Sequence, residues 1–573
     1  MKKVLAFVLA LVLVLSFAAC GQKVEEQPTP DTPEKTDTPA PPAEFPAATE
    51  APEIPEETSG VKLDMVSTPF GEVARYTTPH TEDMTVVDPT TLMIGQSNVI
   101  QSGNPHSGSN SCFYDLVFDR LIEYDLDTGK LTGVIFKDWE MSEDCSSLTF
   151  TMHDNVTFHT GENATAEDVF YTLQRCADPS VSSLADRAIF TNIDFDKSEI
   201  TGTYSGKIVL KTPSVTFLPG LTKCWLLSKN YIESKGEDNA WWAATVGTGA
   251  YKVVDIIQFD RYTLVRNDDY WTGEKVPFEN IVIRFYAEQA TMFMDYETHN
   301  LDVVVAPSAS DVDRAIAGEV ENSVVELSST LATYSVIFNE EKGNPALNDV
   351  NVRKAIALAL DVEVIEALAY QRLGSVSGAL IPVALSDSIP MAYSQDIEAA
   401  KKALKDAGYK AGELELTIGT GNRGGHTRAA ESMQSMLEEV GFKVNIVTAD
   451  GSVNIQNLRN TGPDLYDLSI TNQSFDTLES ANFLGGISHA CGSASFTGAT
   501  DDKVDELALK AQSAKTVEEK EGYMRELQTY LHDNYWTVPI CEEVGVYVYR
   551  DYLSGIRCMI PTSPDFMKLA IVG

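Results

Sequence analysis

The chain has 573 residues and a formal net charge of −41, with 22% charged residues. Because phosphate binding needs a basic surface, this acidity argues against a nucleic-acid-binding protein. The length is too great for one ordinary core, so we expect two or three domains. Seven cysteines beyond Cys20 are dispersed without a CxxC pair, which argues against a disulfide scaffold and leaves their pairing open.

Residues 1–20 resemble a bacterial lipoprotein signal. Lys2 and Lys3 precede an apolar run at 4–17 that is too short to span a bilayer comfortably, and small residues then lead to Cys20. In such signals the peptide is cut before the cysteine, whose thiol is acylated. We therefore expect a lipid on Cys20 and a protein anchored at the extracellular face of the membrane of a Gram-positive bacterium. An ordinary secretory signal cut near Ala19 is the alternative, and it also places the protein outside the cytoplasm.

Residues 21–65 are rich in Pro, Glu and Thr and contain few residues that could form a core. Proline blocks helix and sheet, and the acidic groups repel one another. We interpret this segment as a disordered tether between the lipid and a globular head.

The first half of the head alternates between strand and helix patterns. Period-two alternation predicts a strand at 148–153, and a second short strand follows at 156–159. Thr165 and Asp168 have the spacing of a capping box, so we expect a helix from there to the Asp-Pro pair at 178–179.

The rest of the head continues the alternation, which indicates an α/β protein with several sheets. The pattern predicts further strands at 207–212, 262–267, 281–286 and 334–339, a long amphipathic helix at 352–368, a helix at 395–409, a β-α-β unit at 414–450, helices at 501–512 and 517–534, and a closing strand pair at 537–550.

Gly419, Gly421 and Gly424 fit the pattern GxGxxG between a predicted strand and a predicted helix, and Asp450 ends the next strand. Asp450 lies rather far along the chain for a ribose contact, and the unit stands alone. Reduced nicotinamide is also scarce outside cells. We therefore interpret the glycines as a tight strand-to-helix turn and not as a dinucleotide site.

Other catalytic signatures are absent from the sequence. There is no HExxH, GxSxG, Walker lysine or EF-hand loop, and the eight histidines are scattered. We therefore expect no catalytic residue, no cofactor and no metal site.

Several segments, taken in order, resemble the family 5 extracellular solute-binding proteins, which are oligopeptide and dipeptide receptors of ABC importers. The resemblance covers about 85–560 and is carried by residues 116–144, 148–179, 247–271, 334–361 and 494–511. It implies the α/β, two-lobed fold of type II periplasmic binding proteins in its three-subdomain form, with hinge strands and a cleft between the lobes. The implied division is lobe I at 66–329 with an extra subdomain at about 120–235, lobe II at 330–515, and a C-terminal return to lobe I at 516–573.

The resemblance also implies a function. A monomeric, non-enzymatic protein would close its lobes on a small peptide and deliver it to ABC permease subunits in the membrane. Segment 466–484 aligns with the family's pocket strand and loop, and Asp476 falls on the aspartate that grips a peptide's α-ammonium. Arg459 could meet a ligand carboxylate. Further candidate lining residues are Asn472, Gln473, Asn110, Cys112 and Tyr334, with Asn110 and Cys112 on a loop that extends to Phe113.

Some pocket positions depart from the family pattern. Gln473 stands where the family usually has Trp, and Glu479 and Ser480 replace Asp-Pro. Fewer aromatic walls mean less stacking area and a larger or wetter pocket. An oligosaccharide or a metal chelate therefore remains an alternative ligand, and an extracellular hydrolase is an alternative function of another class.

Overall fold

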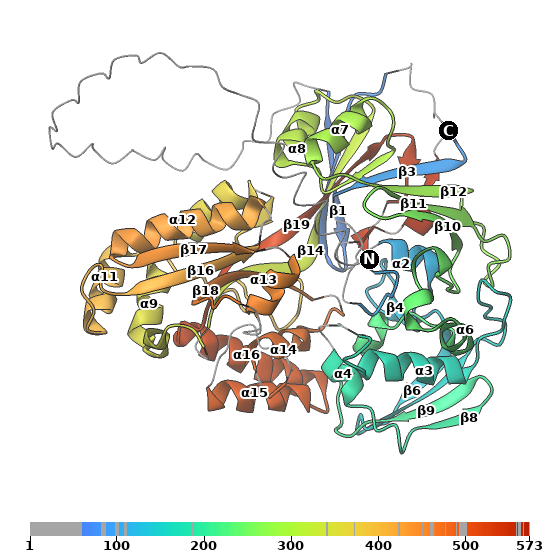
Figure 1. The fold of residues 1–573 in the computed structure, drawn as a ribbon, viewed down its shortest axis with the longest axis horizontal. Helices are drawn as coiled ribbons and strands as arrows, with labels where there is room; N and C mark the ends of the chain where they lie inside the picture. The colour runs from blue at the N-terminus through green and yellow to red at the C-terminus, as the bar shows by residue number, and fades with distance from the viewer. Residues whose placement is uncertain are drawn as a thin grey trace, which may run out of the picture. The chain divides into compact units, whose positions relative to one another are not determined.

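The computed structural model describes a mixed α/β protein (Figure 1). The description covers residues 60–571 except 82–87, 98–101, 108–111, 183, 185–186, 340–341, 372, 422–423, 450, 459–462, 476, 489, 492–500, 557, 560–562 and 565. The predicted lipoprotein signal with Cys20, and the tether up to residue 59, lie outside these residues. The predicted end of the tether at residue 65 is wrong, because Lys62–Thr68 form strand β1, which pairs with β2 (Gly71–Thr77).

The largest sheet of the described residues has 13 strands. Strand β3 pairs in parallel with β12 and β13, whereas β19 pairs antiparallel with both β13 and β14. The main path of the sheet runs β10 (Tyr251–Ile257), β11 (Arg261–Arg266), β12 (Asn280–Phe285), β3 (Thr91–Gln96), β13 (Val303–Val305), β19 (Thr537–Arg550), β14 (Ser323–Phe338), β18 (Leu468–Ser474), β16 (Glu415–Gly421) and β17 (Lys443–Ala449).

Strands β14 and β19 are the longest of the described strands and run side by side through the middle of this sheet (Figure 1). The other edge of β14 pairs first with β2 (Gly71–Thr77), through residues 324–327, and then with β18, through residues 332–338. The β14–β19 register shifts between Ser329 and Thr333, where Leu331 has a φ of 52°. Such a bulge bends a strand and re-aims its side chains. The two long strands therefore connect the two halves of the sheet across a local bend.

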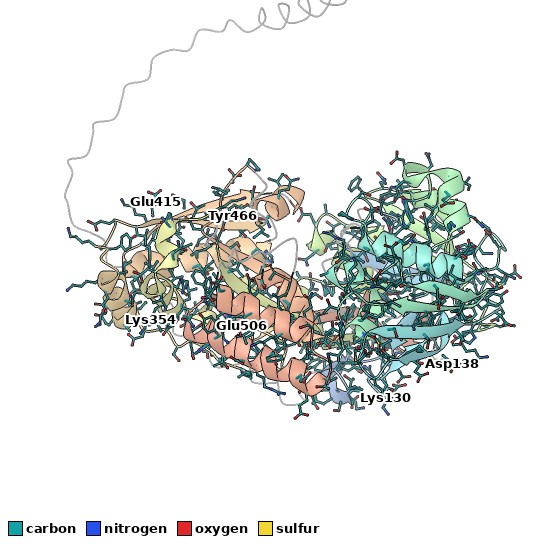
Figure 2. All side chains as sticks on the ribbon, turned by 90° about the horizontal axis from the view of Figure 1, so that it is seen from below. Lys130, Asp138, Lys354, Glu415, Tyr466 and Glu506 are labelled. Carbon is teal, nitrogen blue, oxygen red and sulfur yellow. The ribbon has the colours of Figure 1, made fainter. Side chains whose placement is uncertain are left out.

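Parallel strands β16 and β17, joined by α12 (Gly424–Val440), form the β-α-β unit that the sequence predicts at 414–450. Helices α9 (Val350–Ala359) and α11 (Ile397–Asp406) pack with them around one apolar cluster. A Cβ at Gly419 would lie 1.9 Å from the ring of Tyr466, labelled in Figure 2. Gly419 is therefore needed for close packing against this ring.

A second apolar cluster lies around Leu331 and Phe475 and contains α14 (Leu484–Ile487), α15 (Asp502–Gln512) and α16 (Val517–Asp533). Helix α16 packs against α15. A boundary at residue 515 therefore falls between two helices of the same cluster.

The other half of the sheet has its own cores. One contains β3, β10–β12, α2 (Cys112–Val117) and α6 (Lys229–Lys235). Another contains β13, α7 (Gln289–Glu297) and α8 (Ala309–Ile316), with apolar residues of the long strands β14 and β19.

A separate four-stranded antiparallel sheet has the order β6 (Phe136–Met141), β7 (Ser147–Met152), β9 (Ser205–Val209) and β8 (Glu199–Gly202). It shares an apolar core with α3 (Ala166–Ala177), α4 (Arg187–Thr191) and α5 (Phe217–Gly220). Thr165 and Asp168 form the predicted capping box at the start of α3. The backbone N–H of Thr165 donates to Oδ2 of Asp168 at 2.9 Å.

A hairpin of β1 (Lys62–Thr68) and β2 (Gly71–Thr77) precedes the first strand of the main path. Strand β1 pairs with β2, and β2 pairs in turn with β14. The smaller elements are β4 (Ile122–Tyr124), β5 (Leu131–Gly133), α10 (Val362–Ile365), β15 (Gly374–Ser375), α13 (Gly451–Leu458), β20 (Leu553–Ser554), β21 (Cys558–Met559), β22 (Ser563–Pro564) and β23 (Ala570–Ile571).

Three predicted elements are wrong in detail. Residues 156–159 form only an isolated bridge between Thr157 and Asn163. The helix predicted at 352–368 is interrupted at residues 360–361, where the Asp361 side chain caps α10. Residues 537–550 form one continuous strand and not a strand pair, because they pair along their length with β14.

Charged side chains cover the surface, including those of Lys130, Asp138, Glu415 and Glu506 (Figure 2). Within the described part of the chain, no helix combines the length and the apolar character needed to cross a bilayer.

Candidate functional site

Tyr334 of β14 and Glu543 of β19 meet beside the bend in the long strands. The Tyr334 hydroxyl donates to Oε1 of Glu543 at 2.7 Å. Burial, followed by the charge of Glu543, raises the pKa of Tyr334 well above its usual value. The hydroxyl therefore stays protonated and remains a donor at physiological pH.

The Glu543 carboxylate accepts a second hydrogen bond, from a hydroxyl of β14 at the bend. Oγ1 of Thr330 donates to Oε2 of Glu543 at 3.0 Å. Glu543 is half-buried, and it makes no ion pair with any residue that the structure describes. Two neutral hydroxyl donors therefore hold the carboxylate in place, and no cation among the described residues lies beside it.

Two further aromatic rings extend the site. Tyr370 stacks on Tyr334 with ring centroids 4.4 Å apart and planes inclined by 27°. His426, in the first turn of α12, meets Tyr334 edge-on at 5.6 Å. The Tyr370 hydroxyl is buried and has no hydrogen-bonding partner among the described residues. The site thus combines a carboxylate, an aromatic wall and an unused hydroxyl.

The predicted lining residues Asn472 and Gln473 are neighbours in β18, where successive side chains point to opposite faces. Asn472 is exposed and lies directly opposite Tyr334 in the β14–β18 register. The Gln473 side chain lies against Gly486 of α14, where a Cβ would come within 2.8 Å of Oε1 of Gln473. Asn472 therefore belongs to the Tyr334 face, and Gln473 to the face covered by α14.

The loop after β18 is fixed on both sides of residue 476. The backbone N–H of Phe475 donates to the Leu331 carbonyl at 2.9 Å. On the far side, Glu479 is buried and pairs with Nζ of Lys520 at 2.7 Å. Lys520 also contacts Asp387 at 3.2 Å.

Burial alone would lower the pKa of Lys520, but the two carboxylates outweigh it and raise the pKa. Lys520 is therefore a charged ammonium that neutralises part of the acidity around it. Ser480 completes the cluster by donating a hydrogen bond to Asp387. Glu479 and Ser480 thus hold the loop after β18 to α16.

Two hydrogen bonds connect the region after β18 with residues near the four-stranded sheet. The Tyr124 hydroxyl of β4 donates to the Thr477 carbonyl at 2.9 Å. The backbone N–H of Val215 likewise donates to the Ala514 carbonyl at 3.3 Å, just beyond α15. These bonds join segments that the resemblance assigns to different lobes.

The remaining predicted site residues are not all described. Asn110, Arg459 and Asp476 lie outside the described residues, so their positions stay predictions. Cys112 is buried at the start of α2, in the apolar cluster around Phe113. The segment that the sequence suggested as a loop is therefore helical from residue 112 onward.

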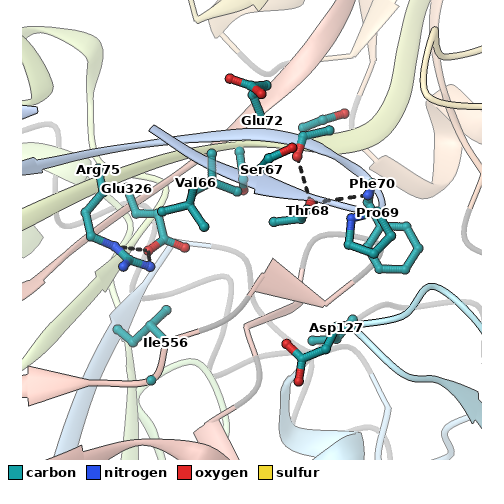
Figure 3. A pocket seen from close by; sticks show the side chains of 16 residues that line it. Val66, Ser67, Thr68, Pro69, Phe70, Glu72, Arg75, Asp127, Glu326 and Ile556 are labelled. Carbon is teal, nitrogen blue, oxygen red and sulfur yellow. Dashed lines mark hydrogen bonds and ion pairs between the residues drawn. The ribbon is translucent and has the colours of Figure 1, made fainter. Parts of the chain in front are cut away.

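A cavity of about 360 Å³ lies beneath the β1–β2 hairpin, beside residues 326–329 of β14 (Figure 3). Its lining includes Phe70, Asp127 and Ile556, as well as Arg75 and Glu326, which form an ion pair at 2.9 Å. The Tyr549 hydroxyl also donates to Glu326 at 3.2 Å. Glu326 is thus already matched by a cation of the chain.

Glu543 and Tyr370 were missed by sequence reasoning. A detectable signal was available for Glu543, since Glu542 and Glu543 are adjacent acids inside an otherwise apolar strand. Tyr370 had no such signal, because it reaches the site only through the π-helical segment Glu366–Tyr370 that follows α10. Within the described residues, no group of three or more His, Cys, Asp or Glu side chains could hold a metal ion.

Comparison with known proteins gives consistent matches. Residues 130–495 match the family described as "Bacterial extracellular solute-binding proteins, family 5 Middle". The chain is 25% identical to heme-binding protein A of Haemophilus influenzae over 457 residues, which is 75% of this chain and 82% of that protein. It is 24% identical to the probable di/tripeptide-binding protein 5 of Pseudomonas aeruginosa over 489 residues, which is 80% of this chain and 90% of that protein.

Among solved structures, the dipeptide-binding protein of Pseudoalteromonas sp. SM9913 in complex with Met-Leu superposes with a TM-score of 0.74. It is 23% identical and covers 84% of this chain and 100% of its own. This similarity confirms the predicted α/β fold of type II periplasmic binding proteins.

Proposed function

Since the chain belongs to family 5 of the bacterial extracellular solute-binding proteins, we propose that it captures small peptides outside the cell for an ABC importer. The lipid on Cys20 holds it at the membrane, and its two lobes close on the ligand. The importer's permease subunits then receive the ligand from the closed form. The protein works as a monomer and catalyses no reaction.

The observation that carries the peptide proposal is the carboxylate of Glu543. Two hydroxyls orient it, and no described cation neutralises it. A charged group in a partly dry site is stabilised by an opposite charge, and charge-assisted hydrogen bonds contribute about 1.5–3 kcal/mol each. A ligand that brings its own ammonium group supplies that charge. A peptide has one at its N-terminus.

Asp476 is the second proposed contact for the ammonium. In the sequence it comes shortly after β18, between Phe475 and Thr477, whose backbone groups are held by hydrogen bonds. Asn472, opposite Tyr334, supplies an amide on the same face. Asn110 and Arg459 stay in the proposal as polar contacts for the rest of the peptide. Gln473 lies on the face covered by α14, and Cys112 is buried in an apolar cluster, so neither is proposed as a contact.

The test is to identify what the protein carries. The full secreted chain would be purified without added ligand, measured by native mass spectrometry, and then denatured so that the released molecules can be sequenced. We expect a mixture of short peptides with free N-termini. A sugar or a metal chelate as the released ligand would contradict the peptide proposal while leaving solute binding intact. Turnover of added peptides or glycosides would contradict the non-enzymatic proposal.

Anchoring and closure have separate tests. Cys20→Ser should release the protein from the membrane fraction, and continued membrane association would contradict the lipid anchor. Addition of the identified ligand should reduce the radius of gyration in small-angle X-ray scattering. An unchanged radius at saturation would contradict lobe closure.

A further inference from the structure

Two buried cysteines face each other in the small-sheet part of the chain, away from the Tyr334 site. Cys176 lies near the end of α3, and Cys224 directly follows the short helical turn Leu221–Lys223. Both side chains are 0% exposed, and their sulfur atoms are 3.7 Å apart. A disulfide has a sulfur–sulfur distance of about 2.0 Å, so the two sulfurs are in contact but not bonded in this structure and must approach each other to be joined.

A buried histidine accompanies the pair. His106 is 0% exposed, and neither of its ring nitrogens has a hydrogen-bonding partner of normal geometry in the described structure. Burial raises the pKa of Cys176, but the hydrogen bond with Cys224 and the neighbouring His106 outweigh it and lower the pKa to about 6. Burial and the proximity of Cys176 raise the pKa of Cys224. One sulfur of the pair is thus the favoured thiolate, which is the nucleophile in thiol–disulfide exchange.

We propose that Cys176 and Cys224 are joined by a disulfide bond in the mature extracellular protein. The family to which the chain belongs is extracellular, and disulfides persist in that compartment. The contact between two fully buried sulfurs in one apolar core carries the proposal. Nothing in peptide capture requires this bond.

The bond forms by exchange with an external disulfide, either of a small thiol compound or of an oxidoreductase. The Cys176 thiolate attacks one sulfur of that disulfide, and the other sulfur leaves as a thiolate. The Cys224 thiol then loses its proton and attacks the Cys176 sulfur, which releases the second thiolate. Two cysteine thiols are oxidised, and the external disulfide is reduced to two thiols. Because both sulfurs are buried in the folded chain, the exchange takes place during folding, when Cys176 already lies beside Cys224 and His106 but the core is still open to the external disulfide.

The bond would close a loop of 48 residues between the end of α3 and the residue that follows the turn Leu221–Lys223. Trp225, next to Cys224, stacks under the guanidinium of Arg120 at 4.5 Å, and its ring N–H donates to Asp115 at 2.9 Å. A cross-link at Cys224 therefore also restrains the neighbouring Trp225 and its contacts with Arg120 and Asp115.

Peptide mapping of the full secreted chain tests the proposal directly. The protein would be alkylated under denaturing conditions without reductant and digested with trypsin. Trypsin cuts after Arg175 and Lys223, so the two cysteines fall in the short peptides 176–187 and 224–229, each with no other cysteine. We expect these two peptides as one linked species that separates on reduction. Recovery of both peptides fully alkylated would overturn the proposal, as would a link from Cys176 to another cysteine or a metal ion retained by the pair.

A matched variant and a stability measurement sharpen this test. Cys145→Ser removes a thiol of the same small-sheet part and should leave the linked species unchanged. Reductant should lower the melting temperature of the wild-type chain by about 5 °C, since the constraint on the unfolded chain is lost. Reductant should not change the melting temperature of the Cys176→Ala/Cys224→Ala double variant. An equal response of both proteins would count against a bond that stabilises the fold.

The role of His106 as a positioning residue has its own readout. The reduced wild-type chain and His106→Phe would be refolded with oxidised glutathione, and the linked species followed over time. We expect the variant to form it severalfold more slowly at pH 7 and at nearly the wild-type rate at pH 9, where the thiol ionises without help. The same deficit at both pH values would show that His106 acts only through packing.

Discussion

Two glutamates on the paired long strands have opposite surroundings. Glu326 of β14 is almost fully buried, and it is matched by Arg75 at 2.9 Å and by the Tyr549 hydroxyl. Glu543 of β19 lies across the bend and has two hydroxyl donors but no cation among the described residues. A matched carboxylate holds chain segments together, whereas an unmatched one is available to a charged ligand. The buried cluster of Glu479, Asp387 and Lys520 belongs to the first kind.

The largest effect is expected where matched carboxylates lose their cation. Lys520→Met leaves Glu479 and Asp387 buried side by side, and breaking such a buried pair costs about 3–5 kcal/mol. The free energy of unfolding, measured with denaturant, should fall by that amount. Lys510→Met, which removes an exposed lysine paired with Glu506, is the matched control and should show no measurable change. Equal losses in the two variants would contradict the distinction.

Glu543→Gln tests the unmatched carboxylate. It keeps the side-chain shape and removes the charge, but its NH2 group replaces one of the two acceptor oxygens, so one of the two hydroxyls must accept from the amide instead of donating. Affinity for a peptide with a free N-terminus should fall roughly 10- to 100-fold, as expected for loss of one charge-assisted hydrogen bond. Isothermal titration measures this change. Glu326→Gln is the control and should stay within about twofold of wild type, because Glu326 already has a partner in the chain.

Arg75→Ala removes the cation from Glu326. Arg75 is about one third exposed, so solvent reduces the cost below that of a fully buried pair. We expect a loss of about 2 kcal/mol in the free energy of unfolding, with peptide affinity unchanged. Replacing Glu326 by Gln in the same chain should restore part of the loss. A drop in affinity without a loss of stability would place Glu326 in the binding site instead.

Asp476→Ala extends the comparison to the loop after β18. If Asp476 meets the ligand's ammonium, affinity for amine-bearing ligands should fall at least about tenfold. Ligands with an acetylated N-terminus should bind wild type and variant equally. An unchanged affinity for the free amine would remove Asp476 from the site.

The smallest effect is expected at the hydroxyl that orients Glu543. Tyr334→Phe deletes one hydrogen bond and keeps the stack on Tyr370. The free energy of unfolding should fall by about 1 kcal/mol. Tyr370→Phe is the matched control: it removes a buried hydroxyl that has no described partner, and it should be neutral. A larger loss from Tyr370→Phe would reveal a contact of that hydroxyl in solution.

Elements that depend on nearby residues were predictable from sequence. The β-α-β unit at 414–450 and the capping box of Thr165 and Asp168 each arise from patterns within a few turns of chain. The length of β14 was not predictable, because its first half is ordered by β2 and β19, which lie far away in sequence. The interruption of the helix at residue 361 was also missed, since its apolar spacing continues across the break.

The candidate site was predictable only in part. Tyr334 and Asn472 were singled out, and the strand register places them opposite each other. Asn472 and Gln473 were expected to share a lining, but alternation along β18 separates them. Glu543 joins the site through pairing of strands about 200 residues apart in sequence, and a one-dimensional pattern does not specify such pairing.

If the lipid anchor proposed at Cys20 holds the protein by its N-terminus, the β1–β2 hairpin has a mechanical consequence. A pull on the chain before Lys62 acts on the open end of the hairpin, where Lys62 is paired with Thr77. In that geometry the hydrogen bonds of β1 break one after another, which requires less force than breaking them together. Strand β2 stays paired with β14 while β1 peels away. Under tension, β1 would therefore unpair and extend the chain before the pairing of β2 with the long strand β14 is broken.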